Sequence, residues 1–367
     1  MAWKQRVDLY QQIEEYRKRP LVVYVTSKRE GAAASMANDA LPNIIDQLDA
    51  LPTEAKALDL LIVSYGGDPM VAWRMMTLIR QRVETVSVMI PQSAYSAATL
   101  VALGADEIIM HPNGHLGPVD MQIVTVGAAG PKRFSTEDIS AFLDFVRDNL
   151  KITDQEHIRM LFETVCKEVG SLGIGFTARS SRLAVDLGER LLALHMKDDE
   201  NRSKLRSIVE NMSRRFQSHA YPVSRNEVID IGLPVNKDRD EKLERLMWNV
   251  WLDVEADLKE RLPFNLLTEL LSSAEASKLL TPIPQLDLPM SAAAVTNFSS
   301  TIPDVKAHAA VSVNPVDFEF KTAIVESSRQ AHECLTRGKI LSCRTPDMVI
   351  QFNAVPTFSG WRETSKT

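Results

Sequence analysis

The first third of the chain alternates between strand-like and helix-like segments. Short aliphatic runs that are apolar on both faces are typical of central strands in a parallel sheet, and segments with apolar residues three or four positions apart separate them. This alternation predicts an α/β fold in which functional sites form at the carboxyl ends of strands. The predicted strands are residues 21–25, 58–63, 86–90 and 107–110, and the predicted helices are 3–18, 38–51, 69–83 and about 96–103.

The pattern becomes mainly helical in the middle of the chain and then changes again near the carboxyl end. A segment expected to be mobile, residues 124–131, precedes helical periodicity over 135–170 and 179–217. A charged amphipathic helix follows and is a candidate oligomer or interdomain contact. A stretch rich in Ser, Ala, Pro and Thr predicts a linker, and short β runs then predict a small β-rich C-terminal module. The four predicted regions are residues 1–237 (main domain), 238–262 (amphipathic helix), 263–305 (linker) and 306–367 (C-terminal module).

Composition and charge narrow the class of protein. The chain has 367 residues, 45% of them hydrophobic and 25% charged, as in ordinary soluble globular proteins. A net charge of -6 gives no electrostatic reason to expect nucleic acid or an anionic membrane as partner. Cys166, Cys334 and Cys343 are too few and too scattered for a disulfide framework or a zinc site. We therefore expect a reducing, cytoplasmic setting.

Targeting and membrane segments are not expected either. The first twenty residues lack the apolar core of a signal peptide. The uncharged run over 85–105 is long enough to span a bilayer, but Pro91 interrupts it. We interpret this run as a buried strand followed by the start of a helix, and so predict no transmembrane segment.

Two small-residue segments at the ends of predicted strands are candidates for chemistry. Gly66-Gly67 follows the strand at 58–63, and Ser96 follows the strand at 86–90. Adjacent parallel strands end at one edge of the sheet, so we expect the two segments to lie together. Paired glycines let backbone amides face a site, and a serine beside a helix start is a candidate nucleophile. Taken singly, the glycines also fit a tight turn and the serine a helix cap.

Four motifs follow one another in an order that resembles a known family. They are Tyr65-Gly66-Gly67-Asp68, Ser96-Ala97-Ala98-Thr99, Ala105-Asp106-Glu107-Ile108 and Leu116-Gly117-Pro118-Val119-Asp120. The set resembles the Clp/crotonase-type serine peptidases, most closely the serine dehydrogenase proteinase family, together with the related signal peptide peptidase A and NfeD types. The later segments His219-Ala220-Tyr221-Pro222 and Gly232-Leu233-Pro234-Val235 are similar to that family's C-terminal signature. The resemblance covers roughly residues 1–236.

The resemblance implies a crotonase/ClpP-like βαβ spiral with a mostly parallel sheet. It implies Ser96 as the nucleophile and the amides of Gly66 and Gly67 as the oxyanion hole. NfeD-type and signal peptide peptidase A-type enzymes use a lysine base, and Lys132, after Gly130-Pro131, matches that context. A lysine acts as a base only where burial or a positive neighbour lowers its pKa. Arg133 is such a neighbour in the sequence.

Histidines are the competing bases. His219 is an alternative base or orienting residue, and His115 follows the fourth strand and can also reach the site. Clp-type enzymes place their histidine where this chain has Met121, so a Ser-His-Asp triad in its usual order is not expected. We interpret His111 and Asp120 as turn and hydrogen-bonding residues.

These residues together predict a serine peptidase that works through a Ser-Lys dyad and an acyl-enzyme. We expect a peptide or protein substrate, a homo-oligomer, and no metal or organic cofactor. The alternatives are an acyl-CoA hydratase or isomerase that uses the same oxyanion amides, and a catalytically inactive scaffold. Two positions depart from the family's pattern, since Tyr65 stands where proline is usual and Ala98 where glycine is usual.

Overall fold

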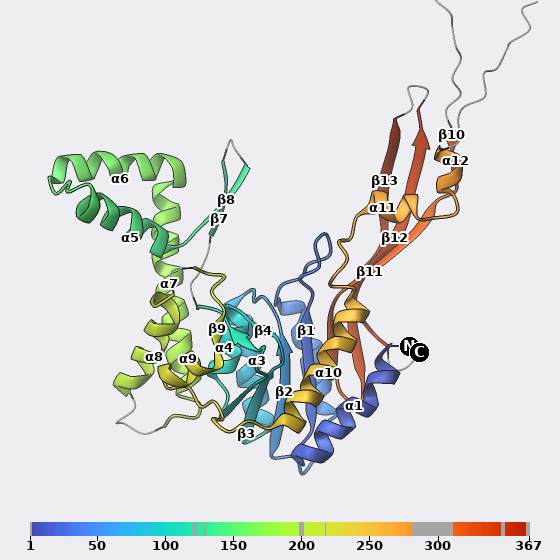
Figure 1. Ribbon diagram of the computed structural model, residues 1–367, viewed down its shortest axis with the longest axis horizontal. Coiled ribbons are helices and arrows are strands. Elements are labelled where there is room, and N and C mark those ends of the chain that lie inside the picture. The colour runs from blue at the N-terminus through green and yellow to red at the C-terminus, as the bar shows by residue number, and fades with distance from the viewer. Residues whose placement is uncertain are drawn as a thin grey trace, which may run out of the picture.

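The computed structural model of this chain describes residues 2–119, 123–127, 130–197, 202–216, 218–280, 311–345 and 349–364. Its centre is a sheet of four parallel strands in the order β1-β2-β3-β5 (Figure 1). All six residues of β1 are buried, as expected of a strand that is covered on both faces. The four strands are β1 (Leu21–Thr26), β2 (Ala57–Val63), β3 (Thr85–Ile90) and β5 (Glu107–Met110).

Alternate side chains of each strand enter two different hydrophobic cores. Val22 and Tyr24 belong to one core, and Leu21, Val23 and Val25 belong to the other. This division follows from the two-residue repeat of a β-strand. The first core lies under α2 (Leu41–Asp49), α3 (Pro69–Arg82), α4 (Ala97–Leu103), α7 (Ser171–Leu192), α8 (Arg202–Arg214) and α9 (Arg225–Ile231), and the second under α1 (Ala2–Arg17) and α10 (Glu241–Leu258).

The C-terminal strands extend this central sheet. β11 pairs antiparallel with β1, for example Val23 with Glu326, so the sheet continues without a break into the last part of the chain. The C-terminal part is β-rich as predicted, but the predicted division at residue 306 does not separate its strands from the main sheet. These strands are β10 (Val311–Ser312), β11 (Val316–Glu326), β12 (Ala331–Arg344) and β13 (Ile350–Glu363).

Two further predictions concern the carboxyl half. The helix predicted as an oligomer or interdomain contact, α10, buries its apolar face against α1 and the sheet of its own chain, so that face is not free for an oligomer contact. The predicted linker begins with two short helices, α11 (Leu266–Leu271) and α12 (Ala276–Leu280). Phe264, Leu270 and Leu279 pack there in a third small core with residues of β11 and β12. The rest of the predicted linker, from residue 281, lies outside the described residues.

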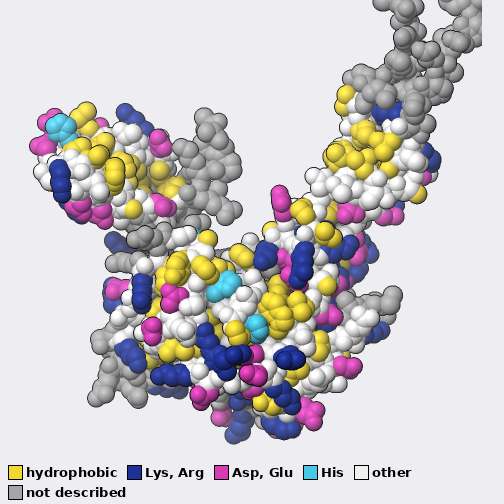
Figure 2. All heavy atoms as spheres, in the orientation of Figure 1, with side chains coloured by type: hydrophobic (Ala, Val, Ile, Leu, Met, Phe, Trp, Pro, Cys, Tyr) yellow, Lys and Arg dark blue, Asp and Glu magenta, His cyan; other side chains and the backbone are white. Residues whose placement is uncertain are grey.

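Two arms rise from the central body (Figure 1). One is the long β12–β13 hairpin, and the other is helical and consists of α5 (Thr136–Asp144), a π-helical turn (Phe145–Asn149), α6 (Gln155–Val169) and the beginning of α7. Residues 124–127 and 130–131 of the segment expected to be mobile belong to the paired strands β7 (Ile123–Gly127) and β8 (Gly130–Phe134). Hydrophobic side chains are visible on the surface of the helical arm (Figure 2).

The predicted fold class is confirmed: an α/β protein with a parallel central sheet and a β-rich C-terminal part. Within the described ranges, no helix combines the length and the apolar character that crossing a bilayer requires.

Candidate active site

A small second sheet brings distant segments together beyond the carboxyl ends of β2 and β3. Its strands are β4 (Ser93–Ala94), β6 (His115–Leu116) and β9 (Val223–Ser224), in the order β4-β6-β9. Ser64, at the end of β2, pairs with Ala94 of β4 through a parallel bridge. The end of β2, the serine segment and the loop after β5 therefore form one corner, as the sequence predicted for Gly66-Gly67 and Ser96.

Ser96 has a backbone conformation that L-residues rarely adopt. Its φ is 53° and its ψ is -115°, at the turn between β4 and α4. The side chain makes no capping hydrogen bond to α4, which removes the helix-cap interpretation of this serine. A strained, partly exposed serine on a strand-to-helix turn is the arrangement that presents a nucleophile in hydrolases.

Gly66 lies directly against this serine, and Gly67 lies against Met36. A Cβ atom on Gly66 would fall 2.8 Å from Cβ of Ser96 and 2.9 Å from the amide nitrogen of Ala97. Gly66 has a φ of 90°, and Gly67 has a φ of 154°. A Cβ on Gly67 would fall 2.3 Å from the carbonyl oxygen of Met36. Both positions therefore require glycine for close backbone approach.

The backbone amides of this corner divide into two kinds. The Gly66 N–H donates to Oγ of Ser64 at 3.1 Å, so this amide is already engaged. Among the described residues, the N–H groups of Gly67 and Ala97 have no acceptor. Gly66, which precedes Gly67 in the chain, lies against the amide nitrogen of Ala97. The amides of Gly67 and Ala97 therefore belong to the same corner. Sequence reasoning missed Ala97, although its position directly after a candidate nucleophile is the signal that can find it.

Ser64 is a second residue that sequence reasoning missed. Its side chain is fully buried and lies 2.7 Å from Oγ1 of Thr26 at the end of β1. Its backbone exchanges hydrogen bonds with the serine segment, since its N–H donates to Ser93 and its carbonyl accepts from Tyr95. Ser64 thus connects two strand ends, the glycine turn and the serine segment.

Two motif residues have structural roles around Tyr95. Oγ1 of Thr99 is buried and lies 2.7 Å from the carbonyl of Ala94 and 2.8 Å from the carbonyl of Gly117. A Cβ on Gly117 would come within 1.9 Å of the Tyr95 ring, so only glycine leaves room for that ring. Burial raises the pKa of Tyr95 to about 12, which keeps its phenol protonated at neutral pH.

The acidic motif is structural as well. Asp106 accepts the Val86 N–H at 2.7 Å and forms an ion pair with Arg80. Glu107 forms an ion pair with Arg17 at 2.6 Å near the amino ends of the strands. These contacts hold the start of β5 in the sheet, so the two carboxylates are not available as catalytic acids at the opposite edge.

The structure describes the candidate bases to different extents. Lys132 lies in β8, opposite Thr125 of β7, but its side chain lies outside the described part of the structure. Lys132 as base therefore stays a prediction. His219 is half-buried on a turn that precedes β9, which pairs with β6 of the small sheet. The topology thus brings the His219 segment to the same small sheet as the serine.

His115 lies in β6 and its ring packs edge-on against Tyr95, with 5.4 Å between ring centroids. Burial lowers its pKa, and Nδ1 lies 3.2 Å from the carbonyl oxygen of Asn113. A neutral ring that donates from Nδ1 to this carbonyl would leave Nε2 as a proton acceptor. The turn role expected for His111 is confirmed, since its Nδ1 accepts the Asn113 N–H at 3.0 Å. Asp120 lies outside the described residues.

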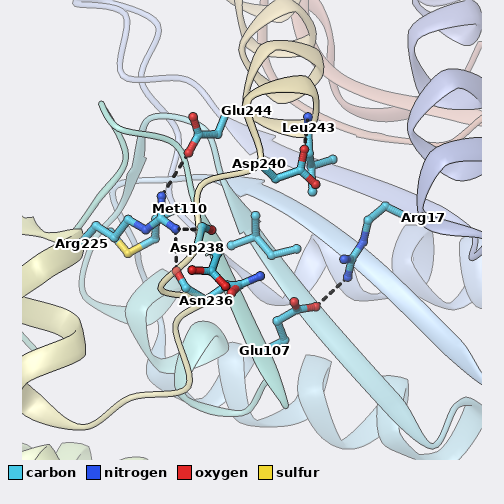
Figure 3. A pocket seen from close by; sticks show the side chains of 10 residues that line it. Arg17, Glu107, Met110, Arg225, Asn236, Asp238, Asp240, Leu243 and Glu244 are labelled. Carbon is cyan, nitrogen blue, oxygen red and sulfur yellow. Dashed lines mark hydrogen bonds and ion pairs between the residues drawn. The ribbon is translucent and has the colours of Figure 1, made fainter.

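A polar pocket lies elsewhere, between β5, α9 and α10 (Figure 3). Its volume is about 30 Å³, which is room for a water molecule rather than a peptide. Two ion pairs lie in its lining, Arg225 with Glu244 at 3.0 Å and Arg17 with Glu107 at 2.6 Å. None of the predicted site residues lines it.

Comparison with protein families identifies the segment that carries this corner. Residues 39–138 match the family described as ClpP-like SDH-type serine proteinase. The matched segment contains Gly66, Gly67, Ser96 and Lys132, whereas His219 lies outside it. The resemblance inferred from the ordered motifs is therefore confirmed for this segment.

Two curated proteins of Methanocaldococcus jannaschii, the uncharacterized proteins MJ1495 and MJ0137, are similar to this chain. The first is 25% identical over 197 residues, which are 54% of this chain and 58% of that protein. The second is 26% identical over 204 residues, which are 56% of this chain and 62% of that protein. The match thus spans less than two thirds of either relative.

The solved structures that match part of this chain include two proteases. A mutant of the membrane-bound stomatin-specific protease 1510-N gives a TM-score of 0.35 at 14% identity, over 62% of this chain and 84% of that one. ClpP1 from Listeria monocytogenes gives a TM-score of 0.31 at 13% identity, over 65% of this chain and 98% of that one.

Proposed function

We propose that this protein is a serine peptidase that cleaves peptide bonds through an acyl-enzyme on Ser96. The single observation that carries the proposal is the strained, non-capping Ser96 held against Gly66. The match of residues 39–138 to a serine proteinase family supports the same reaction class. A nucleophile alone is not sufficient, because acyl transfer also needs oxyanion donors and a base.

In the proposed reaction, Oγ of Ser96 attacks the peptide carbonyl carbon as a base takes its proton. The carbonyl oxygen becomes an oxyanion, which accepts hydrogen bonds from the amides of Gly67 and Ala97. The protonated base then gives its proton to the leaving amine, and the C–N bond breaks. Water, activated by the same base, attacks the acyl-enzyme and releases the acid. Gly66 supplies close approach rather than a donor, because its amide is bonded to Ser64.

Lys132 is our proposed base, on the strength of its motif context, and His219 and His115 are the competitors. Hydrolysis of a fluorogenic peptide by Ser96→Ala, Lys132→Met, His219→Asn and His115→Asn variants tests the assignment. We expect background activity for Ser96→Ala and a fall in kcat/KM of about 10²–10⁴-fold for Lys132→Met. Wild-type-like activity of Lys132→Met, with loss in one histidine variant, would reassign the base to that histidine.

The pH dependence of kcat/KM provides an independent check on the base. A histidine base whose pKa is lowered by burial, as for His115, would keep the enzyme active below about pH 6.5. A lysine base, whose pKa is brought down only toward about 7–8, would lose activity already as the pH falls through that range. An acidic limb well below pH 6.5 would therefore contradict Lys132.

We also propose that the protein is a homo-oligomer, with the helical arm as the contact. α6 has no buried residue, and the arm exposes Phe145, Phe162, Leu172 and Phe176. A Phe162→Glu variant is expected to lower the mass measured by light scattering. Thr164→Glu adds the same charge at another exposed position of α6 and is the control. An unchanged mass for both variants would exclude this surface.

A further inference from the structure

Two stacked tyrosine rings connect the segment of Ser96 with Lys28, which lies on the loop that follows β1. Tyr95, which precedes Ser96, stacks on Tyr65 with 5.1 Å between ring centroids and 18° between ring planes. Nζ of Lys28 lies 3.3 Å from the hydroxyl oxygen of Tyr65 and 5.3 Å from the centre of its ring. Tyr65 is itself bonded to Gly66, which lies against Ser96. The two stacked rings thus connect the ammonium group to the corner that holds the candidate nucleophile.

The ammonium group of Lys28 is exposed and has no carboxylate within ion-pair distance among the described residues. The carboxylate of Glu260 is bonded instead to the backbone N–H of Lys28, at 3.1 and 3.3 Å. Asp68, beside the glycine turn, accepts the N–H of Met70 as the cap of α3. Burial raises the pKa of Glu260, and the charge of Lys28 opposes that shift, so the two groups interact without forming an ion pair. Lys28 thus offers a positive charge that is not held in an ion pair with a described residue.

The loop that carries Lys28 is fixed at several points. Nε of Arg29 donates to the Leu262 carbonyl at 2.6 Å, and the Phe264 N–H donates to the Glu30 carbonyl at 2.7 Å. At the other end of the loop, the Met36 N–H donates to the Gly66 carbonyl at 2.7 Å. The loop is therefore attached both to the glycine turn and to the segment after α10. A charge on such a loop is pre-organised for binding.

We propose that Lys28, held by the ring and hydroxyl of Tyr65, forms a subsite for a carboxylate group of the substrate. The carboxylate belongs to an Asp or Glu side chain, or to the chain terminus, close to the bond that Ser96 attacks. This inference rests on the proposed peptidase function, because it places the subsite beside that nucleophile. It also gives a role to Tyr65, the residue that departs from the family's proline: the tyrosine positions the ammonium group.

Peptide binding to the Ser96→Ala protein tests the subsite without requiring turnover. Three fluorescent peptides of one sequence are compared: one with an internal Glu and an amidated end, one with Gln and a free carboxyl end, and one with Gln and an amidated end. We expect one of the two charged peptides to bind about fivefold more tightly than the neutral one at low salt. The charged peptide that shows the preference identifies the source of the carboxylate.

Variants on the Ser96→Ala background assign this preference to one residue. Lys28→Met is expected to abolish it and Lys28→Glu to reverse it, whereas Tyr65→Leu is expected to reduce it. Lys56→Met is the matched control, because it removes the same charge from an exposed lysine at the start of β2, the opposite end of the strand. Equal binding of all three peptides, or a preference that persists in Lys28→Met, overturns the subsite.

The outcome is separable from that of the proposed function. Suppose that the carboxylate preference depends on Lys28 but the wild-type protein does not cleave peptides. This result would support the subsite and reject the peptidase proposal. Cleavage that depends on Ser96, with no charge preference in binding, would support the peptidase proposal and reject the subsite.

Discussion

Two amphipathic helices of this chain, α10 and α6, have similar periodic patterns and different surroundings. In α10, Met247, Val250 and Val254 are fully buried against α1 and the sheet. In α6 no residue is buried, and Phe162 is 38% exposed. The pattern of α10 predicted an oligomer or interdomain contact, and its apolar face packs within its own chain. The exposed apolar residues of the helical arm support our proposal that an oligomer contact lies there instead. Periodicity thus identifies the apolar face of a helix but not what covers it.

The largest expected contrast between the two helices is in stability. Trp251 of α10 is 3% exposed, and Trp251→Ala is expected to lower the free energy of unfolding by about 3–5 kcal/mol. Phe162→Ala in α6 removes a comparable ring from a partly exposed position and is expected to cost about 1 kcal/mol or less. Urea denaturation of both variants at low protein concentration measures the difference. Equal losses would mean that α6 is covered within the single chain.

A smaller loss of stability is expected from a substitution at Ser64, where the buried sheet meets the candidate site. Ser64→Ala removes the hydroxyl that contacts Thr26 and accepts the Gly66 N–H. Loss of these buried hydrogen bonds is expected to cost about 1–3 kcal/mol of stability. Because the glycine turn loses its support, the rate of Ser96 labelling by a fluorophosphonate is expected to fall as well. Normal labelling in a destabilised variant would limit Ser64 to a structural role.

The smallest expected effect is a pH dependence of folding stability that arises where His111 packs against α10. The ring of His111 stacks on Trp248 of α10, with 4.8 Å between ring centroids, and burial lowers the pKa of this histidine. Glu244 opposes that shift and Arg239 adds to it. The unfolded chain therefore takes up the proton at higher pH than the folded chain, so stability is lost as the pH falls below about 6.5.

A His111→Asn variant isolates this contribution, because His115 and His195 have lowered pKa values from the same cause and remain in place. Unfolding free energies of the variant and the wild type, measured across this pH range, should converge as the pH falls. If the difference between the two unfolding free energies stays constant with pH, His111 does not contribute to the pH dependence of stability.

Much of the sheet and part of the site were predictable from local sequence. Apolar runs identified β1, β2, β3 and β5, because strands buried on both faces need continuous aliphatic side chains. Gly66 and Ser96 were predicted to meet because parallel strands end at one edge. The pairing of β1 with β11 was not predictable, since it joins segments that lie about 300 residues apart and no local pattern records it.

The parts of the site that escaped prediction have no distinctive side-chain chemistry. The amide of Ala97, which has no acceptor among the residues that the structure describes, is a backbone group, and no side-chain pattern in the sequence marks it. Ser64 reads as one more small residue after a strand, although its hydroxyl joins two strand ends. The motif carboxylates Asp106 and Glu107 show the converse, because acidic residues in a matching motif turn out to hold β5 in place.

The most direct test of the central claim is mass spectrometry of the protein after reaction with a fluorophosphonate. Our account predicts a single adduct, located by peptide mapping on Ser96, that is absent from the Ser96→Ala variant. Ser93→Ala, three residues away, is the control and is expected to keep the adduct. A folded protein that forms no adduct, or that forms one which persists in Ser96→Ala, would contradict the assignment of Ser96 as the nucleophile.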